Sequence, residues 1–508
     1  MKILRSLLVL ALLCSVTACQ DDFLETLPLN APSDKLFWKT EQDAIFWINQ
    51  AYRDLPGAGD YVFNAMSDDA YTPTTANGVI ANGTYETTSS IMTLKWGYGT
   101  IRHCLELLAR IDEIPNMNPE LNKRLKGEAQ FIIALKYMEM TTLYQDVPLV
   151  DKVLPLAESD IPKSPKDEVV KYALGLLDTA IPNLPVRYPS AADNGRITRG
   201  AALSLKARLL LYNSRWAEAA AAAKAVMDLN EYQLHPKFNE LFLTAFNNQT
   251  KEVILAYQYA KDLSVHTLQF SYSFYQVGGT GASLPLPDLV NSFESKDGLP
   301  ITESPLYDPM KPFENRDPRF AQTFITPFEV FAGIKYDPVN NKDDKTQAKT
   351  YVYYRKYIAD MVNQQRSSWV NWIIFRYAGV LLMYAEAKNE ATGPDETVYS
   401  ALDQIRTRAG MPKVDRAKYG TQAKLRDFIR NERRVELAGE GLRYYDILRW
   451  KIADQVLNKS IVSFTIPGVL PLQNIEKRVF NPAKNYVWPL PQTAVDNAKN
   501  LEQNPAWK

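Results

Sequence analysis

The stretch from Ile197 to Leu229 constrains the fold more than any other part of the chain, because its apolar residues repeat with the period of two consecutive helices. Thr198 is a suitable N-cap for the first helix, and Asn213-Ser214 marks a turn before the second. The first apolar face holds Leu203, Ala207, Leu210 and Leu211, and the second holds Trp216, Ala219, Ala220, Ala223 and Met227. The small alanines allow close approach, so the sequence predicts a packed helix pair.

A helix-turn-helix of about 34 residues with Trp and Ala at such positions resembles a tetratricopeptide unit. Three looser copies are indicated at Leu121–Tyr144, Val370–Arg408 and Leu425–Leu457. Such pairs bury a continuous core only when each covers its neighbour. We therefore expect a mostly α protein with a tetratricopeptide-like helix-pair scaffold whose repeats are scattered along the chain.

Residues 56–94, 230–350 and 460–493 are rich in proline and aromatic residues and show no helical period. We expect long irregular loops with short strands there. Loops of this length inside a compact body usually serve a function or form a subdomain, so the ligand surface is expected on them and the helices are expected to be the scaffold.

The N-terminus predicts export. Lys2 and Arg5 precede the apolar run Leu7–Leu13, which is too short to span a bilayer, so residues 1–18 are interpreted as a signal peptide. The sequence Val16-Thr17-Ala18-Cys19 resembles a bacterial lipobox, which implies cleavage before Cys19 and lipidation of its thiol. The mature body would then be residues 19–508.

Cysteine content agrees with this processing. Cys14 leaves with the signal peptide and the lipid occupies Cys19, so Cys104 remains alone and no intramolecular disulfide can form. We interpret Cys104 as a small buried apolar residue. The acidic run Gln20-Asp21-Asp22 resembles a tag that sends some lipoproteins to the cell surface.

Charge and motif content exclude several functional classes. The 58 basic residues balance the 58 acidic ones, so there is no Lys/Arg excess for nucleic acid. G-x-S-x-G, H-E-x-x-H, Walker and C-x-x-C motifs are absent, and His103, His235 and His266 are scattered. We expect a protein that is not an enzyme and has no cofactor or catalytic metal; a structural calcium leaves no signature in residue spacing.

Four segments carry a family resemblance that covers nearly the whole chain. They are Arg376–Ala378 running into Leu381–Ala387, then Leu402–Gly410, Asn431–Trp450 and the tail Leu501–Trp507. Supporting matches in the first 320 residues are Trp96, Tyr98, Ile101, Cys104, Leu107-Leu108, Asp297-Gly298 and Asp317-Pro318-Arg319. The sequence resembles the SusD/RagB family of outer-membrane nutrient-uptake lipoproteins, with a SusD-like part at about 19–230 and a RagB/SusD part at about 231–508 of one body. Leu105 and Ala506 depart from the family pattern, where Asn and Gly are common.

The resemblance implies a function. Such a protein would be anchored by lipid to the outer membrane, face the exterior, bind an oligosaccharide and deliver it to a SusC-like TonB-dependent transporter that contacts the helix pairs. Oligopeptide cargo is the main alternative within the family. Two alternatives from other classes remain open: a surface glycosidase, which needs two opposed carboxyls, and a helical-repeat scaffold or adhesin without a small ligand.

The segment around Asn431-Glu432-Arg433-Arg434 favours structure over catalysis. Glu432, Glu436 and Glu440 recur every four residues, and Arg443, Asp446 and Arg449 every three, so we expect them on one helical side as an ion-pair lattice. Carboxylates surrounded by this many cations should have lowered pKa values, whereas a glycosidase acid needs a raised one.

Aromatic residues make up 11% of the chain and supply the candidate ligand contacts. Two clusters stand out, one of Tyr257, Tyr259, Phe270, Tyr272, Phe274 and Tyr275, the other of Tyr351, Tyr353, Tyr354, Tyr357, Trp369, Trp372, Phe375 and Tyr377. Each ring is either core or a platform for the apolar face of a sugar. Tyr275, Trp369 and Trp372 are the candidates here, because Gln364, Gln365, Arg366 and Asn371 surround the two tryptophans.

The family resemblance adds Tyr71, Trp96 and Tyr98 to the candidate ligand contacts, and Trp96 could equally anchor helix packing. The run Gly278–Gly281 lacks the lysine of a phosphate loop and is interpreted as a flexible binding or capping loop.

Overall fold

The computed structural model of the protein describes residues 37–341, 349–360 and 367–508. The predicted signal peptide and Cys19 lie outside the described residues. No helix among the residues described has both the length and the apolar character that crossing a membrane requires.

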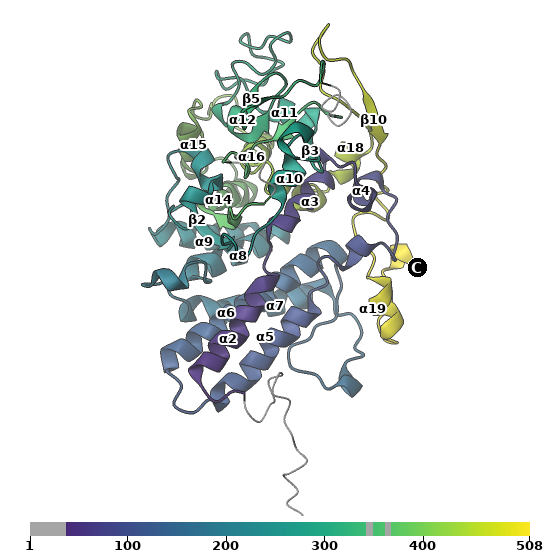
Figure 1. The fold of residues 1–508 in the computed structure, drawn as a ribbon. Coiled ribbons are helices and arrows are strands. Elements are labelled where there is room, and N and C mark those ends of the chain that lie inside the picture. The colour runs from purple at the N-terminus through teal and green to yellow at the C-terminus, as the bar shows by residue number, and fades with distance from the viewer. Residues whose placement is uncertain (1–36, 342–348, 361–366) are drawn as a thin grey trace, which may run out of the picture.

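Four helices form the lower part of the molecule in Figure 1: α2 (Glu41–Ala51), α5 (Tyr98–Arg110), α6 (Pro119–Tyr144) and α7 (Lys166–Asn183). Local sequence explains where two of them begin. Thr40 and Asp43 form a reciprocal capping box at α2, and the side chain of Asn118 accepts from the first backbone amides of α6, where Pro119 occupies the first turn.

The predicted pair at Ile197–Leu229 is confirmed as α8 (Arg199–Tyr212) and α9 (Trp216–Asp228). The Thr198 hydroxyl accepts from the amide of Ala201 at 3.2 Å, as expected for an N-cap. The stack then continues through a segment distant in sequence, because α9 packs on α14 (Tyr377–Thr392), followed by α15 (Glu396–Ala409) and α16 (Gln422–Glu436). Together with the run of contacts from α6 through α7 and α8 to α9, this confirms the mostly α helix-pair scaffold.

The looser copies differ from the sequence-based expectation. Leu121–Tyr144 is one uninterrupted helix, α6, and its partner α7 follows after a long connection. No turn forms inside α6 because the segment lacks a helix-breaking pair, and its one glycine, Gly127, lies against Leu184. Val370–Arg408 contains a strand before its two helices, and Leu425–Leu457 contains most of α16 followed by the short helices α17 (Arg443–Arg449) and α18 (Ala453–Leu457).

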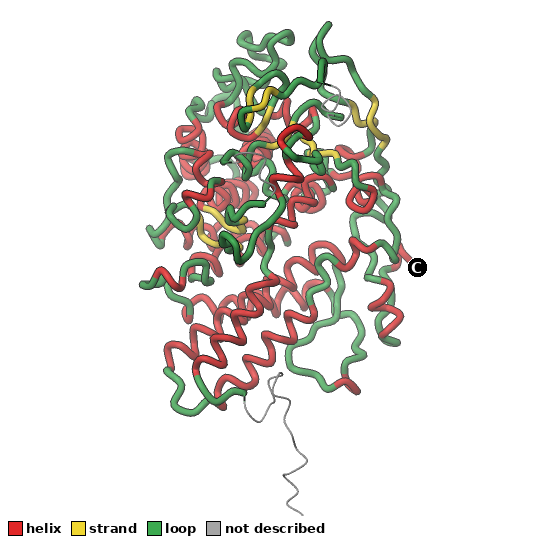
Figure 2. Tube along the Cα trace, in the orientation of Figure 1, coloured by secondary structure: helices red, strands yellow, loops and turns green. Residues whose placement is uncertain are grey.

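The three long irregular stretches hold most of the short elements, as expected. Within the described residues, five antiparallel two-stranded ribbons pair β1 (Ala70–Tyr71) with β3 (Leu284–Pro285), β2 (Val253–Tyr257) with β8 (Trp372–Arg376), β4 (Phe324–Ile325) with β7 (Tyr353–Tyr354), β5 (Val330–Phe331) with β6 (Ile334–Lys335), and β9 (Ser460–Val462) with β10 (Asn474–Lys477). The short helices are α3 (Val62–Ala65), α4 (Thr75–Asn82), α10 (Leu268–Tyr272), α11 (Pro287–Ser292), α12 (Pro318–Thr323) and α19 (Gln492–Asn497). Figure 2 shows the strands in the upper part of the molecule, above the group of α2, α5, α6 and α7.

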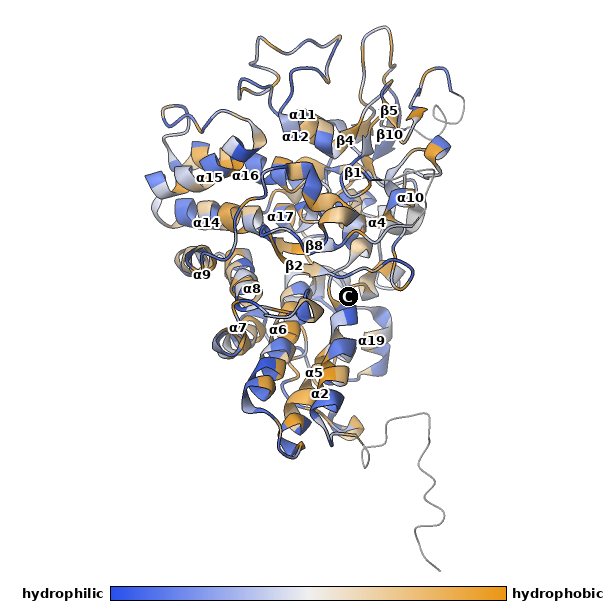
Figure 3. Ribbon diagram, turned by 60° about the vertical axis from the view of Figure 1, so that its left-hand side comes forward, coloured by the Kyte–Doolittle hydropathy of each residue, from blue (hydrophilic) through white to orange (hydrophobic). Residues whose placement is uncertain are grey.

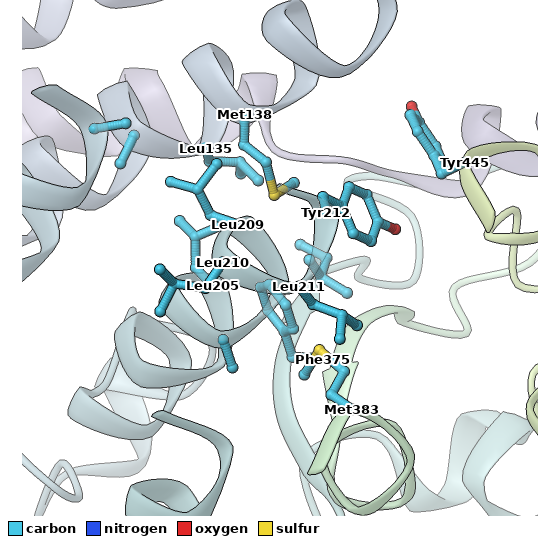
Figure 4. Close-up of a cluster of buried hydrophobic side chains, with 14 of the residues drawn as sticks. Leu135, Met138, Leu205, Leu209, Leu210, Leu211, Tyr212, Phe375, Met383 and Tyr445 are labelled. Carbon is cyan, nitrogen blue, oxygen red and sulfur yellow. The ribbon is translucent and has the colours of Figure 1, made fainter. Parts of the chain in front are cut away.

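Apolar side chains form two cores, one in the helix stack and one in the irregular part. Figure 3 shows hydrophilic and hydrophobic residues interleaved along the long helices, as expected for elements with one buried face. Figure 4 shows the junction of the helical core, where leucines of α8 lie with Leu135 and Met138 of α6, Phe375 of β8 and Met383 of α14. The β2–β8 ribbon therefore packs against the helix stack, whereas most of the strand-bearing part has a core of its own.

Candidate functional site

Trp96 and Tyr98 lie together at the start of α5. The ring centroid of Trp96 is 5.0 Å from that of Tyr98 and 5.2 Å from that of Tyr144, with both contacts edge-to-face. The Tyr98 hydroxyl donates to the carbonyl of Pro148 at 2.6 Å. These contacts fix both rings before any ligand arrives.

The two rings line a pocket of about 280 Å³. Its walls come from α5, the connection between α6 and α7, and α19, and the remaining lining residues are Arg102, Pro148, Val150, Lys152, Leu154, Ser159, Ile161, Ala494, Ala498 and Leu501. Trp96 is half-buried, and its indole N–H has no hydrogen-bond partner within the described part of the chain. An aromatic wall with a free donor and cations at the rim fits the apolar face and hydroxyls of a sugar ring.

Tyr71 and Tyr275 are not part of this pocket. Tyr71 lies opposite Leu284 in the β1–β3 ribbon and is half-buried, and burial together with the nearby Glu476 carboxylate raises its pKa. Tyr275 begins a 3-10 turn in the irregular part and is 54% exposed. The structure therefore spreads the candidate aromatics over more than one surface.

Trp369 and Trp372 occupy different environments. The Trp372 ring is 2% exposed and stacks on Tyr357 at 4.8 Å between centroids, which favours the core alternative for this residue. Trp369 is only partly buried, and the Lys261 ammonium lies 5.5 Å from its ring centroid. One aromatic of this pair can thus reach a ligand, and Lys261 covers part of its ring.

The amide groups around Trp369 bind one another. Asn371 donates from Nδ2 to Oε1 of Gln258 at 3.0 Å, and its Oδ1 accepts from the amide of Tyr259 at 2.9 Å. Asn247 donates to the carbonyl of Trp369 at 2.7 Å. This network fixes the β2–β8 ribbon and leaves fewer groups for a ligand than the sequence suggested. Gln364, Gln365 and Arg366 lie outside the described residues.

The glycine run is held by backbone hydrogen bonds. Gly279 donates to Phe274 O at 3.0 Å and Gly281 to Ser273 O at 3.1 Å. A Cβ on Gly279 would lie 2.0 Å from the Ser273 carbonyl oxygen. The loop is packed tightly against its own preceding turn, and glycine is required by this close approach.

The acidic residues of the Asn431–Trp450 segment are buried in ion pairs. Glu436 accepts from Arg319 at 2.9 Å, from Arg376 at 2.6 Å and from Arg408. Glu440 pairs with Arg376 and with Lys356 at 2.6 Å. Burial alone would raise the pKa of each carboxyl, but the surrounding cations hold both pKa values below their ordinary range, so the lowering predicted for Glu436 is confirmed.

The expectation of a single helical side is wrong in its geometry. Helix α16 ends at Glu436, and Gly439 and Gly441 take positive φ of 77° and 74° in the turn that follows, so Glu440 is not on the same helix. A Cβ on Gly441 would lie 2.8 Å from the Asp60 carbonyl oxygen. The cations that meet the glutamates come from α12, β8, α15 and the segment after β7, which holds Lys356, so the lattice ties distant segments together.

The three histidines each contact a different neighbour. His103 stacks on Trp47 with centroids 4.3 Å apart, His235 lies 2.7 Å from a carboxylate oxygen of Glu240, and His266 lies 3.0 Å from the carbonyl of Val370. Across residues 37–341, 349–360 and 367–508, no group of three His, Cys, Asp or Glu side chains is arranged to hold a metal ion.

Sequence reasoning missed most of the pocket beside Trp96. Pro148, Val150, Ala494 and Ala498 join it from segments far from α5 in sequence. Leu501 belongs to the tail that carries the family resemblance, but nothing in the sequence places that tail against α5. The lining depends on tertiary contacts alone.

A protein-family model and several known proteins match this chain. The model of the SusD family matches residues 251–507. A SusD-like protein of Formosa agariphila is 26% identical to this chain, covering 98% of it and 97% of the relative. A SusD-like carbohydrate-binding protein from Bacteroides fragilis is 27% identical with a TM-score of 0.85, covering 92% of this chain and 100% of that one. A second SusD-like protein from the same species is 26% identical with a TM-score of 0.83, covering 93% and 98%.

Proposed function

Because this chain belongs to the SusD family, we propose that it is a cell-surface glycan-binding protein that captures oligosaccharides and delivers them to a SusC-like TonB-dependent transporter in the outer membrane. The B. fragilis protein that shares its fold over nearly the whole length is named as carbohydrate-binding. Lipid attached to Cys19 would hold the body at the membrane.

The pocket beside Trp96 is the observation that carries the assignment of a ligand site. It joins an aromatic wall whose rings are already fixed to cationic and hydroxyl groups at the rim. Preorganisation matters because a ring that must be ordered on binding offsets part of the affinity it provides. The capture role therefore needs no rearrangement of Trp96 or Tyr98.

No hydrolytic role follows from the carboxylates of the Asn431–Trp450 segment. Glu432 and Glu436 are 3% and 0% exposed and are bound by arginines, so a glycosidic bond cannot reach them. A retaining or inverting glycosidase needs both carboxyls at the substrate. The burial of Glu432 and Glu436 therefore supports a binding role and not a hydrolytic one.

The test is calorimetric titration of the purified protein with a panel of neutral oligosaccharides and peptide digests, with reducing ends assayed in the same samples. We expect saturable binding of an oligosaccharide without new reducing ends. Replacing Trp96 by Ala should weaken binding by about two- to tenfold, since an aromatic contact contributes about 0.5–1.5 kcal/mol beyond its buried area.

The matched control is Trp369→Ala, which removes the half-buried indole of the other candidate surface. Equal loss in both variants, or loss in Trp369→Ala alone, would move the site away from Trp96. Binding of peptides instead of sugars would favour the oligopeptide alternative, and binding of neither would favour the scaffold. A Cys19→Ala variant should leave the membrane fraction, which fractionation measures directly.

A further inference from the structure

A second and larger pocket, of about 540 Å³, opens where three helices end. Gln145 follows α6, Asn213 and Ser214 follow α8, and Lys451 follows α17, while Lys166 begins α7. We call it the basic pocket, and its lining residues are Thr142, Gln145, Lys166, Asp167, Val170, Tyr212, Asn213, Ser214, Arg215, Leu448, Arg449, Lys451 and Tyr486. It shares no lining residue with the pocket beside Trp96.

The charge lining the basic pocket is predominantly positive, and two of its cations lack carboxylate partners. Arg449 pairs with Glu386 at 2.6 Å, and Arg215 pairs with Glu218. Lys166 and Lys451 have no carboxylate within ion-pair distance in the part of the chain that the structure describes.

The pKa of Lys166 is lowered in this position. Burial lowers its pKa, and the nearby ammonium of Lys451 lowers it further, against the opposing carboxylates of Asp167 and Asp146. Burial also lowers the pKa of Lys451. An anion placed between the two ammonium groups would relieve their repulsion and hold both protonated.

Tyr212 adds a buried polar group that no residue satisfies. Its side chain lines both the basic pocket and a smaller cavity beside Tyr445 and is 8% exposed, and its hydroxyl, which is itself inaccessible to solvent, has no hydrogen-bond partner among the described residues. Figure 4 shows this ring at the edge of the leucine cluster, with the hydroxyl pointing away from Leu209 and Leu210. A buried hydroxyl without a partner costs free energy unless a ligand or water accepts from it.

The remaining wall suits a polyhydroxylated ligand. Gln145, Asn213 and Ser214 offer amide and hydroxyl groups, and the ring of Tyr486 lies 4.5 Å from the Lys451 ammonium. Gln145, Ser214 and Lys451 are also non-glycine residues at positive φ of 65°, 58° and 55°, a conformation that costs free energy and is retained where the surroundings impose it. The pocket volume lies in the range of small-molecule sites.

We propose that the basic pocket binds a saccharide that carries an oxyanion, either the carboxylate of a uronate or a sulfate ester, with Lys166 and Lys451 holding the anion. This site is separate from the pocket beside Trp96. The inference rests on the proposed function only in taking the ligand to be a saccharide.

The experiment is calorimetric titration of the full-length protein at low salt with four probes of known composition. They are an oligogalacturonate, a sulfated galactan oligosaccharide, a neutral galactan oligosaccharide of the same length, and inorganic sulfate. We expect at least one acidic oligosaccharide to bind more tightly than the neutral one, with an affinity that falls as salt rises, because screening weakens exposed charge contacts.

Three variants locate the site. The double variant Lys166→Gln with Lys451→Gln should weaken acidic binding by about tenfold or more, because hydrogen bonds to charged groups are the stronger ones. Tyr212→Phe removes an unpartnered hydroxyl that is inaccessible from the pocket, so it should bind the acidic probes as the parent does without lowering the melting temperature. The control Lys171→Gln changes an exposed lysine of α7 outside the pocket and should bind as the parent does.

The outcomes separate this inference from the proposed function. Unchanged acidic binding in the double variant, or equal binding of neutral and acidic probes, overturns the anion site. Inorganic sulfate binding as tightly as the sulfated oligosaccharide overturns the saccharide part. A protein that binds neutral sugars through Trp96 and no acidic one refutes the basic pocket alone, whereas a protein that binds no saccharide refutes both proposals.

Discussion

Replacing Glu436 by Gln should destabilise the fold more than any surface charge change, because this carboxylate holds three guanidiniums. It is 0% exposed, and it meets Arg319 from α12, Arg376 from β8 and Arg408 from α15. The neutral amide keeps the size of the side chain but removes one negative charge from the buried network, so the three guanidiniums keep only their remaining partners Asp317, Glu432, Glu252 and Glu440. Breaking a buried ion pair from one side costs about 3–5 kcal/mol.

The melting temperature converts this cost into a measurement. The unfolding entropy is about 2.1 cal/mol/K per residue, which gives about 1 kcal/mol/K for a chain of 508 residues. The shift in melting temperature is the free-energy cost divided by this entropy, so the melting temperature should fall by about 3–5 °C. Differential scanning calorimetry measures the shift. The matched control is Glu120→Gln, whose carboxylate pairs with Lys123 at an exposed surface and should change stability by less than about 1 kcal/mol.

The pH dependence gives a second check on the same variant. The folded pKa of Glu436 lies below its ordinary value of 4.5, so its contribution is complete above that pH and is lost as pH falls toward the folded pKa. The parent should therefore lose more stability than Glu436→Gln on acidification below about pH 4.5. A melting-temperature shift equal to that of Glu120→Gln, or an unchanged acid profile, would refute the reasoning.

Three further predictions concern other buried groups. Burial raises the pKa of Glu294 to about 7, against the opposing effect of the Arg406 guanidinium. The contribution of Glu294 to stability is therefore complete below pH 4.5 and is lost as pH rises through about 7. The variant Glu294→Gln should gain melting temperature relative to the parent as pH rises from about 5 to about 7. Gly279→Ala should lower the melting temperature because of its contact with Ser273, whereas Gly379→Ala, in helix α14 with nothing within 4 Å, should raise stability by about 0.5–1 kcal/mol. Burial raises the pKa of the Cys104 thiol, so a thiol reagent should modify it only after denaturant unfolds the chain, and fast labelling of the native protein would contradict this.

Part of the architecture was predictable because it depends on local periodicity. The pair α8 and α9 follows from the spacing of apolar residues and from Thr198, whose cap acts within one turn. The four family segments also lie in single stretches of sequence, and the family they indicate is confirmed. The lowered pKa of Glu436 was predicted from the cations of its own segment, but the cations that lower it, Arg319, Arg376 and Arg408, come from other parts of the chain.

Other features required the folded chain, because they join residues that are distant in sequence. Trp369 and Trp372 look alike in sequence, yet the β2–β8 ribbon buries one of them and leaves the other partly accessible. The basic pocket could not be predicted either, since Lys166 and Lys451 meet only where the ends of several helices converge. Sequence periodicity determines which face of a helix is buried, whereas the ends of helices come together only after the whole stack has packed.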